Sequence, residues 1–456
     1  MAAMKVKSEK AWNTGFLINK LVIEQHADEI ELDWVRRNRA VTAPHYKLKD
    51  LRRLDDLVEA HLDALMLARD DGWQAIENLG FDEDGLSFTG TVLALMSGNV
   101  GRLEQVVTEA TGDVDLERGV ISAFGWVPFG KVANQLRHML TSQSPAIQRI
   151  AIAAFGIHRQ DPGIFLQQAV GSPDVALRAR ALKVCGELGR RDLSAELALA
   201  VRDDDESVRF QGAWALARLG VRSGVVLDCL RDIALANGPY AESAVAMRVR
   251  HMDIESAKGW CRSLRGSEEY HRLGLIGMGV VGDPELLPEI LASTQVAEVA
   301  RVAGASFADI VGIDLDYEDL DGDDPAEIER EAADNEGQDA DDADSSDEDE
   351  QVVEEDADEM PEADEMPESD EDLAWPHTER AFAWLHENRS RFVSGTKYFV
   401  GAPMSKPSLD SILRTGTQRQ RVMASIELGI LSPASALFPV RANAMTQKQL
   451  LATWTS

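Results

Sequence analysis

The chain has 456 residues, and its 46 Lys and Arg residues face 79 Asp and Glu residues, for a formal net charge of −33. Most of this excess lies between Asp314 and Asp372, where 32 acidic side chains accompany a single basic one, Arg330. The remaining 47 acidic and 45 basic side chains leave a net charge of −2. The composition therefore excludes an evenly acidic surface and predicts a nearly neutral folded part with one acidic insert.

Hydrophobic residues make up 44% of the chain and aromatic residues only 6%. Ala, Leu and Val dominate, which favours stacked helices over a β-sandwich, whose strands prefer β-branched and aromatic residues. The longest apolar stretches, Leu273–Gly282 and Val296–Ala305, are too short to span a bilayer. We therefore expect an all-α protein with a large core and no membrane segment.

Features of the amino terminus and the cysteines indicate the compartment. The apolar run that follows Lys5, Lys7 and Lys10 is interrupted by polar residues and has no small-residue cleavage site, so no signal peptide is expected. The cysteines are odd in number and widely spaced, which favours buried thiols over a disulfide framework or a zinc cluster: Cys185, Cys229 and Cys261. The sequence predicts a cytoplasmic protein.

A repeat runs through the middle of the chain. Asp174–Gly189 and Asp205–Gly220 align at an offset of 31 residues, and each passes from Asp through an apolar–Arg pair and an Ala-rich stretch to Leu-Gly. A second helix is expected after each, at Leu193–Val201 and Val225–Ala234. Weaker copies begin near five other positions: Asp113, Ser144, Gly238, Ser267 and Thr294.

The pattern has a physical explanation in a helical solenoid. One helix hairpin does not bury both of its faces, whereas hairpins stacked in register share a continuous core. Asp174 and Asp205 stand where a helix needs an N-cap, and the glycine after each helix suits a left-handed C-cap. The unit resembles short HEAT-type repeats, and we expect the second helix of each hairpin to line the inner face of the solenoid.

These observations predict an all-α, short HEAT-like helical-hairpin repeat solenoid with helical caps and a disordered acidic insert. Residues 1–85 form the N-terminal helical cap, with an amphipathic helix within Lys49–Arg69, and residues 86–313 form the solenoid. Residues 314–372 are the insert, which has too little apolar surface to offset the entropy of ordering. Residues 373–456 form a C-terminal helical region with a further repeat-like unit at Ser408–Gly429.

The strongest candidate for a cofactor motif is Gly277-Met-Gly279-Val-Val-Gly282, a GxGxxG pattern after an apolar stretch. A dinucleotide site needs this pattern between a strand and a helix. The repeat register instead makes Leu273–Val281 the first helix of a unit and Gly282 its corner. We therefore interpret these glycines as helix-packing residues.

Other candidate motifs also favour structural interpretations. Ser394–Lys397 reads SxxK but lacks the companion motifs of penicillin-binding enzymes. His45 and His61 could be brought together by folding, although satisfied structural histidines are the simpler interpretation. No EF-hand spacing fits the acidic insert. The sequence therefore assigns no catalytic, cofactor-binding or metal-binding residues, and it predicts no enzyme and no cofactor.

Nucleic-acid binding requires a basic stripe that displaces counterions from phosphates. The section from Leu373 onward is basic, and four of its arginines could line one face: Arg414, Arg419, Arg421 and Arg441. The strongly acidic insert nearby would compete for that face. On this electrostatic ground we expect no nucleic-acid partner.

Several separate stretches together resemble a known family. They are Ala43–Leu65 with Gly72-Trp73, the repeat block, GTKYFVGAP at Gly395–Pro403, GTQRQRVMASIELGI at Gly416–Ile430 and LFPVRA at Leu437–Ala442. They are similar to a proteobacterial family of HEAT-repeat proteins of uncharacterised function, often encoded beside type VI secretion spike and effector-loading genes. The resemblance covers most of the chain except the acidic insert, and it defines no catalytic residues.

Three functions are compatible with these features. The first is a non-catalytic scaffold or adaptor whose concave face grips another protein; the resemblance implies a secretion spike component, an effector or a chaperone. The second is an immunity-type inhibitor of a toxin, with the acidic loop in a basic active site. The third is a cofactor-binding, lyase-like HEAT protein, supported only by Gly277–Gly282 and a few histidines.

Overall fold

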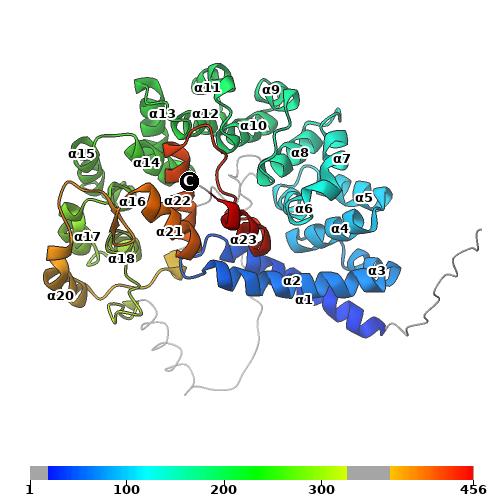
Figure 1. The fold of residues 1–456 in the computed structure, drawn as a ribbon, viewed down its shortest axis with the longest axis horizontal. Helices are drawn as coiled ribbons and strands as arrows, with labels where there is room; N and C mark the ends of the chain where they lie inside the picture. Colours follow the sequence, from blue (N-terminus) through cyan, green and yellow to red (C-terminus); the bar gives the residue numbers. More distant parts are fainter. Residues whose placement is uncertain (1–18, 326–369, 455–456) are drawn as a thin grey trace, which may run out of the picture.

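The computed structural model describes residues 19–325 and 370–454, which are almost entirely helical. Three helices form the N-terminal cap: α1 (Lys20–Ala40), α2 (Leu48–Ala68) and α3 (Asp70–Leu79). A curved row of helix hairpins follows and bends into an arc (Figure 1). The predicted all-α solenoid is confirmed. No helix in the described ranges combines the length and the apolar character needed to cross a bilayer.

Each hairpin of the arc consists of a first and a second helix. The first helices are α4 (Asp84–Ser97), α6 (Val114–Trp126), α8 (Pro145–Ile157), α10 (Val175–Leu188), α12 (Glu206–Arg218), α14 (Ala241–Arg250), α16 (His271–Val281) and α18 (Ala297–Val311). The second helices are α5 (Val100–Ala110), α7 (Phe129–Met139), α9 (Ile164–Val170), α11 (Ser194–Ala200), α13 (Gly224–Leu235), α15 (Ile254–Arg265) and α17 (Leu287–Ser293). Short 3₁₀ turns precede two of them, Arg191–Leu193 and Pro284–Leu286. The first helices from α6 to α18 begin within four residues of the predicted repeat starts, whereas the hairpin of α4 and α5 was not among them.

The recurring residues at the start of each unit form recurring hydrogen bonds. The side chains of Asp174 and Asp205 accept from the backbone N–H groups of Leu177 and Val208, as the N-cap prediction requires. Three residues in equivalent positions donate to the carbonyl six residues earlier: Gln148 to Ser142, Arg178 to Ser172 and Arg209 to Asp203. In these three units a polar side chain of the first helix therefore fastens that helix to the turn that enters it.

The first helices line the inner side of the arc, and the second helices lie outside (Figure 1). The expectation that the second helices line the inner face is therefore wrong. Both helices of a hairpin carry apolar residues on the faces that meet their neighbours, so the hydrophobic pattern does not distinguish inside from outside.

The GxGxxG stretch lies inside α16, as the repeat register predicts. Gly277 and Gly279 are buried in this helix, and a Cβ atom on Gly277 would stand 2.6 Å from the Sγ of Cys261 in α15. Gly282 is the left-handed C-cap, with a φ of 67°. These glycines allow close helix packing and supply a corner, and they do not border a parallel sheet.

The C-terminal region folds back across the inside of the arc. It contains α20 (Thr378–Asn388), the two-stranded hairpin β1 (Tyr398–Phe399) and β2 (Ala402–Pro403), α21 (Lys406–Thr415), α22 (Gln418–Leu431) and α23 (Ala444–Thr453), with 3₁₀ turns at Asp370–Asp372 and Arg389–Arg391. Helix α20 packs beside α17, whereas α22 packs on α12 and α23 on α2. The predicted repeat-like unit, α21 with α22, thus lies inside the arc and does not extend the row (Figure 1).

Most of the predicted acidic insert, residues 326–369, lies outside the described residues. Its two described ends pack against the solenoid. Leu315 and Leu320 are buried, and the backbone of Asp321 pairs with that of Pro376. The ends of the insert therefore leave and rejoin the folded part side by side.

Glycine corners at the ends of the first helices receive the C-terminal backbone. Atoms of the C-terminal region lie against four of them: Tyr398 at Gly282, Val400 at Gly312, Ala434 at Gly189 and Pro433 at Gly220. The connector that holds β1 also hydrogen-bonds to these helix ends, from Tyr398 N–H to the Gly282 carbonyl at 2.8 Å and from Gly401 N–H to the Ile310 carbonyl at 3.1 Å. The Leu-Gly and Val-Gly corners are therefore docking positions as well as caps.

Replacing Gly282 with alanine tests this docking. We expect Gly282→Ala to lower the free energy of unfolding by about 2–4 kcal/mol, because a left-handed alanine costs about 1–2 kcal/mol and its Cβ atom would also overlap the Tyr398 carbonyl oxygen. Gly98 is the matched control, since it has a similar φ of 68° and open space around it. Gly98→Ala should lose only the conformational part, about 1 kcal/mol. Equal shifts of the two urea-unfolding midpoints would contradict the contact.

Candidate functional site: a cavity on the concave face

The segment 433–443, which connects α22 to α23, forms a wall on the concave side of the solenoid. The guanidinium of Arg218, fully buried in α12, donates to the carbonyl oxygens of Pro433, at 2.6 Å, and Ser435. Arg159 donates to the Leu437 carbonyl at 2.9 Å, and Leu437 N–H donates to the Glu187 carbonyl at 2.8 Å. Side chains just after α8 and in α12, with the backbone of α10 between them, therefore fix the path of this segment.

A buried polar network holds the other side of the same segment. Arg421 in α22 is fully buried and donates to the Leu413 carbonyl at 2.7 Å and to Gln447 Oε1 at 2.6 Å. The amide of Gln447 in turn donates to the carbonyls of Val440 at 2.7 Å and Ala442 at 2.6 Å. The GTQRQR sequence supplies Arg421 to this network, and the LFPVRA sequence supplies the carbonyls of Val440 and Ala442, with Gln447 between them.

The N-terminal cap closes the arc onto the same segment. Arg37 of α1 donates to Asp55 of α2 at 2.9 Å and to the Arg441 carbonyl at 3.0 Å, and the other oxygen of Asp55 accepts from the N–H of Ala444. The Gln418 N–H also donates to the Tyr46 carbonyl at 2.6 Å. The N-terminal cap is thus joined to the C-terminal region, which lies inside the arc (Figure 1).

A cavity of about 640 Å³ remains between this wall, α1 and the inner helices. Five consecutive first helices, α6, α8, α10, α12 and α14, contribute to it, together with α1, α22 and residues 437–443. Its apolar surface includes Ile121, Phe210 and Trp214. A volume of this size suits a drug-sized molecule or a few residues of a peptide.

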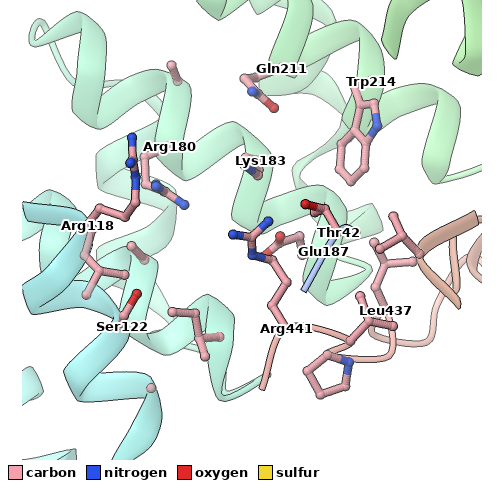
Figure 2. A pocket seen from close by; sticks show the side chains of 18 of the residues that line it. Thr42, Arg118, Ser122, Arg180, Lys183, Glu187, Gln211, Trp214, Leu437 and Arg441 are labelled. Atoms are coloured by element: carbon pink, nitrogen blue, oxygen red, sulfur yellow. The ribbon is translucent and has the colours of Figure 1, made fainter. Parts of the chain in front are cut away.

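Cationic side chains outnumber anionic ones on the cavity wall by seven to four. Arg118 of α6, Arg180 and Lys183 of α10 and Arg441 of the C-terminal wall point into one space (Figure 2). Two other arginines are paired with anionic neighbours on the wall, Arg149 with Glu117 at 2.5 Å and Arg159 with Glu187 at 2.7 Å. Arg118 is likewise paired, with Asp115 at 2.9 Å, and the cavity wall as a whole carries three more cationic than anionic side chains.

The cysteines lack the properties of reactive nucleophiles. Burial raises the pKa of the Cys185 and Cys261 thiols to about 12 and that of Cys229 to about 11. All three thiols are free and therefore stay protonated at neutral pH.

Lys397 of the SxxK stretch belongs to a buried ion pair. Its Nζ lies 2.9 Å from Glu427 Oε1, and Arg250 Nε lies 3.1 Å from the same oxygen. Burial raises the pKa of the Glu427 carboxyl, but the positive charges of Lys397 and Arg250 outweigh it and hold this pKa below its ordinary value. These residues join the C-terminal region to α14.

The four C-terminal arginines that could line one basic face are separated in the structure. Arg421 is fully buried, Arg414 pairs with Asp410 at 2.9 Å, and Arg419 lies 3.9 Å from Asp309. Only Arg441 lines the cavity. Although Arg414, Arg419 and Arg421 are close in sequence, the four arginines lie on different elements, in α21, in α22 and in the segment after α22.

The structure does not bring His45 and His61 together. His45 contacts Tyr46, with ring centroids 4.6 Å apart, whereas His61 meets His26 of α1. Sequence reasoning missed the cavity as well, since its residues come from seven helices and a loop. The recurrence of Arg or Lys along the first helices was the available signal.

Comparisons with known proteins identify the repeat type. Residues 164–248, which span α9 to most of α14, match the model of HEAT repeats. No curated protein matches the chain. Among solved structures, the crystal structure of an engineered protein is similar at 14% identity, covering 66% of this chain and 91% of that one with a TM-score of 0.26. That score is too low for the engineered protein to inform fold or function.

Removing the Arg218 anchor should open the cavity wall. Burial, with the charge of Arg159, lowers the pKa of the Arg218 guanidinium to about 10, so it is still charged at neutral pH. We expect Arg218→Met to lower the free energy of unfolding by about 3 kcal/mol, because two carbonyls lose a charged donor. Limited proteolysis within 432–437 should also become faster. Arg222→Met, at an exposed position four residues on, is the control; equal proteolysis of the two variants would contradict the anchor.

Proposed function

We propose that this protein is a non-catalytic, protein-binding scaffold or adaptor that receives a short segment of a partner protein in its concave cavity. The HEAT repeats and the helical solenoid support the scaffold role, since solenoids present extended concave surfaces for binding. The observation that carries the proposal is the cavity itself, which is bordered by five consecutive repeats and closed by the protein's own C-terminal segment.

The wall chemistry supports an anionic segment with an apolar neighbour. Arg118, Arg180 and Lys183 offer charged donors on one side, and Trp214 and Phe210 offer aromatic surface on another. Guanidinium groups bind carboxylates in a bidentate geometry, and aromatic side chains are frequent anchors in binding pockets. A peptide carrying Asp, Glu or a C-terminal carboxylate beside a large apolar residue has the matching chemistry.

The identity of the partner rests on the family resemblance. It points to a spike component, an effector or a chaperone of a type VI secretion system, and so to a cytoplasmic loading or delivery role. The stretches that carry the resemblance include the C-terminal sequences that build the cavity wall. A family-wide role in binding is consistent with that placement.

The alternatives differ in their support. The cofactor-binding, lyase-like function relied on Gly277–Gly282, and those glycines are buried in or cap a packed helix. The immunity-type inhibitor relies on the acidic insert, most of which lies outside the described residues. The cavity is therefore the better basis for an experiment.

Cavity variants test the proposal by quantitative co-purification from the native host. We expect Arg118→Glu, which reverses a charge, and Ser122→Trp, which fills space, each to reduce recovery of a specific partner at least tenfold, equivalent to about 1.4 kcal/mol of binding free energy. Arg231→Glu on the outer helix α13 is the matched control, because the Arg231 side chain is 40% exposed and lies outside the cavity. Equal recovery by all variants and the wild type would exclude the cavity as the binding site.

A further inference from the structure

A second cluster of functional groups lies in the N-terminal cap, outside the concave cavity. His26 and Glu29 are three residues apart on α1 and so share one face of that helix, and His61 faces them from α2. The two Nδ1 atoms of His26 and His61 are 2.9 Å apart, and Glu29 Oε2 lies 3.9 Å from the Nδ1 of His61. One donor atom from each of the three residues lies within 4.8 Å of the other two.

Two of these side chains are oriented by neighbours that bind their far sides. Asp33 Oδ2 lies 3.3 Å from His61 Nε2, on the opposite side of the ring from the Nδ1 atom that faces His26 and Glu29. The side-chain amide of Gln25 donates to Glu29 Oε1 at 2.7 Å, while Oε2 faces His61. A carboxylate behind a histidine is the usual outer partner of a metal-bound imidazole.

The distances fit a zinc ion. Because Zn–N bonds are about 2.0–2.1 Å long, two ligand atoms on a tetrahedral zinc ion stand about 3.3 Å apart. The separations of 2.9 Å and 3.9 Å lie on either side of this value. Glu29 is half exposed and has room to move, while the His61 side chain is only 11% exposed and fixed by Asp33.

Another cluster of possible metal ligands already holds a cationic side chain of the protein itself. Glu255, Asp283 and Glu285 also bring three donor atoms together. There, however, the ammonium group of Lys258 lies among them, at 2.7 Å, 3.2 Å and 2.6 Å from the three carboxylates. That cluster already has its cation and has no need of a metal, whereas the donor set on α1 and α2 consists of two imidazoles and one carboxylate.

We propose that His26, Glu29 and His61 bind one zinc ion, with Asp33 as the residue that positions His61. The three ligands leave a fourth coordination position for water or for a donor from a partner, on the exposed side marked by Glu29. The ion joins α1 to α2 near the start of the described chain. It therefore stiffens the N-terminal cap, which contacts the C-terminal region inside the arc. The site is independent of the cavity and of the proposed scaffold function.

Metal titration of the full-length protein, stripped of metal with a chelator, tests the site. We expect one Zn²⁺ ion per chain to bind with a dissociation constant in the micromolar range or below, measured by competition with a chromophoric chelator. Co²⁺ should give the visible absorption of a tetrahedral site with nitrogen ligands. A hydrogen bond alone between the two imidazoles would give neither result.

Variants locate the ion. His26→Ala and Glu29→Gln should each weaken binding at least tenfold, and Asp33→Asn about 10–100-fold, as expected when an outer partner is lost. His26 and Glu29 are at least partly exposed, so these two variants are expected to fold. His45→Ala is the matched control, since His45 contacts Tyr46 and lies outside the cluster. Absence of stoichiometric binding by the wild type, or an equal loss in His45→Ala, would overturn the proposal.

Discussion

The structure depends on one constraint, which is that a stretch of non-helical backbone crosses the concave face of a helical solenoid. Its peptide groups leave water there, and each unpaired buried N–H or carbonyl would cost roughly 1–3 kcal/mol. The repeats meet this requirement with Arg159 and Arg218, and α22 and α23 meet it with Gln418 and Gln447. The glycine corners let the backbone approach closely enough for these bonds to form.

Closing the arc changes what the solenoid can do. In an open solenoid each repeat contacts only its neighbours, so small rotations add along the row and the concave face can flex. Here the C-terminal region contacts α2, α12 and α18 at once, and distant repeats are fixed relative to one another. The cavity is therefore a preformed site, and a ligand that fits it loses less free energy to reorganisation of the protein.

The sequence predicts the parts of the fold that depend on local interactions. Asp174 and Asp205 mark helix starts because an N-cap is satisfied within three residues, and Gly282 marks a corner because a left-handed residue follows the helix directly. The position of α21 and α22 was not predictable from such signals, since the same amphipathic pattern serves a helix at the end of the row and one inside the arc. The cavity and the pair formed by His26 and His61 depend on contacts between residues that are far apart in the sequence. The periodicity of the sequence does not report such contacts.

The buried arginines show how the wall gains a unique position. Apolar packing is non-directional, and residues 433–443 could slide along the inner helices with little loss of buried area. Arg37 and Arg218 prevent this, because each guanidinium donates to carbonyl oxygens of the segment in a fixed geometry. Arg421 acts through Gln447, which donates to the Val440 and Ala442 carbonyls. Burying three charges costs free energy that several charge-assisted hydrogen bonds must offset. These arginines therefore matter more for the position of residues 433–443 along the inner helices than for the stability of the fold. The shape of the cavity, and with it any selectivity for a partner, therefore depends in part on two buried cations outside the cavity wall, Arg218 and Arg421.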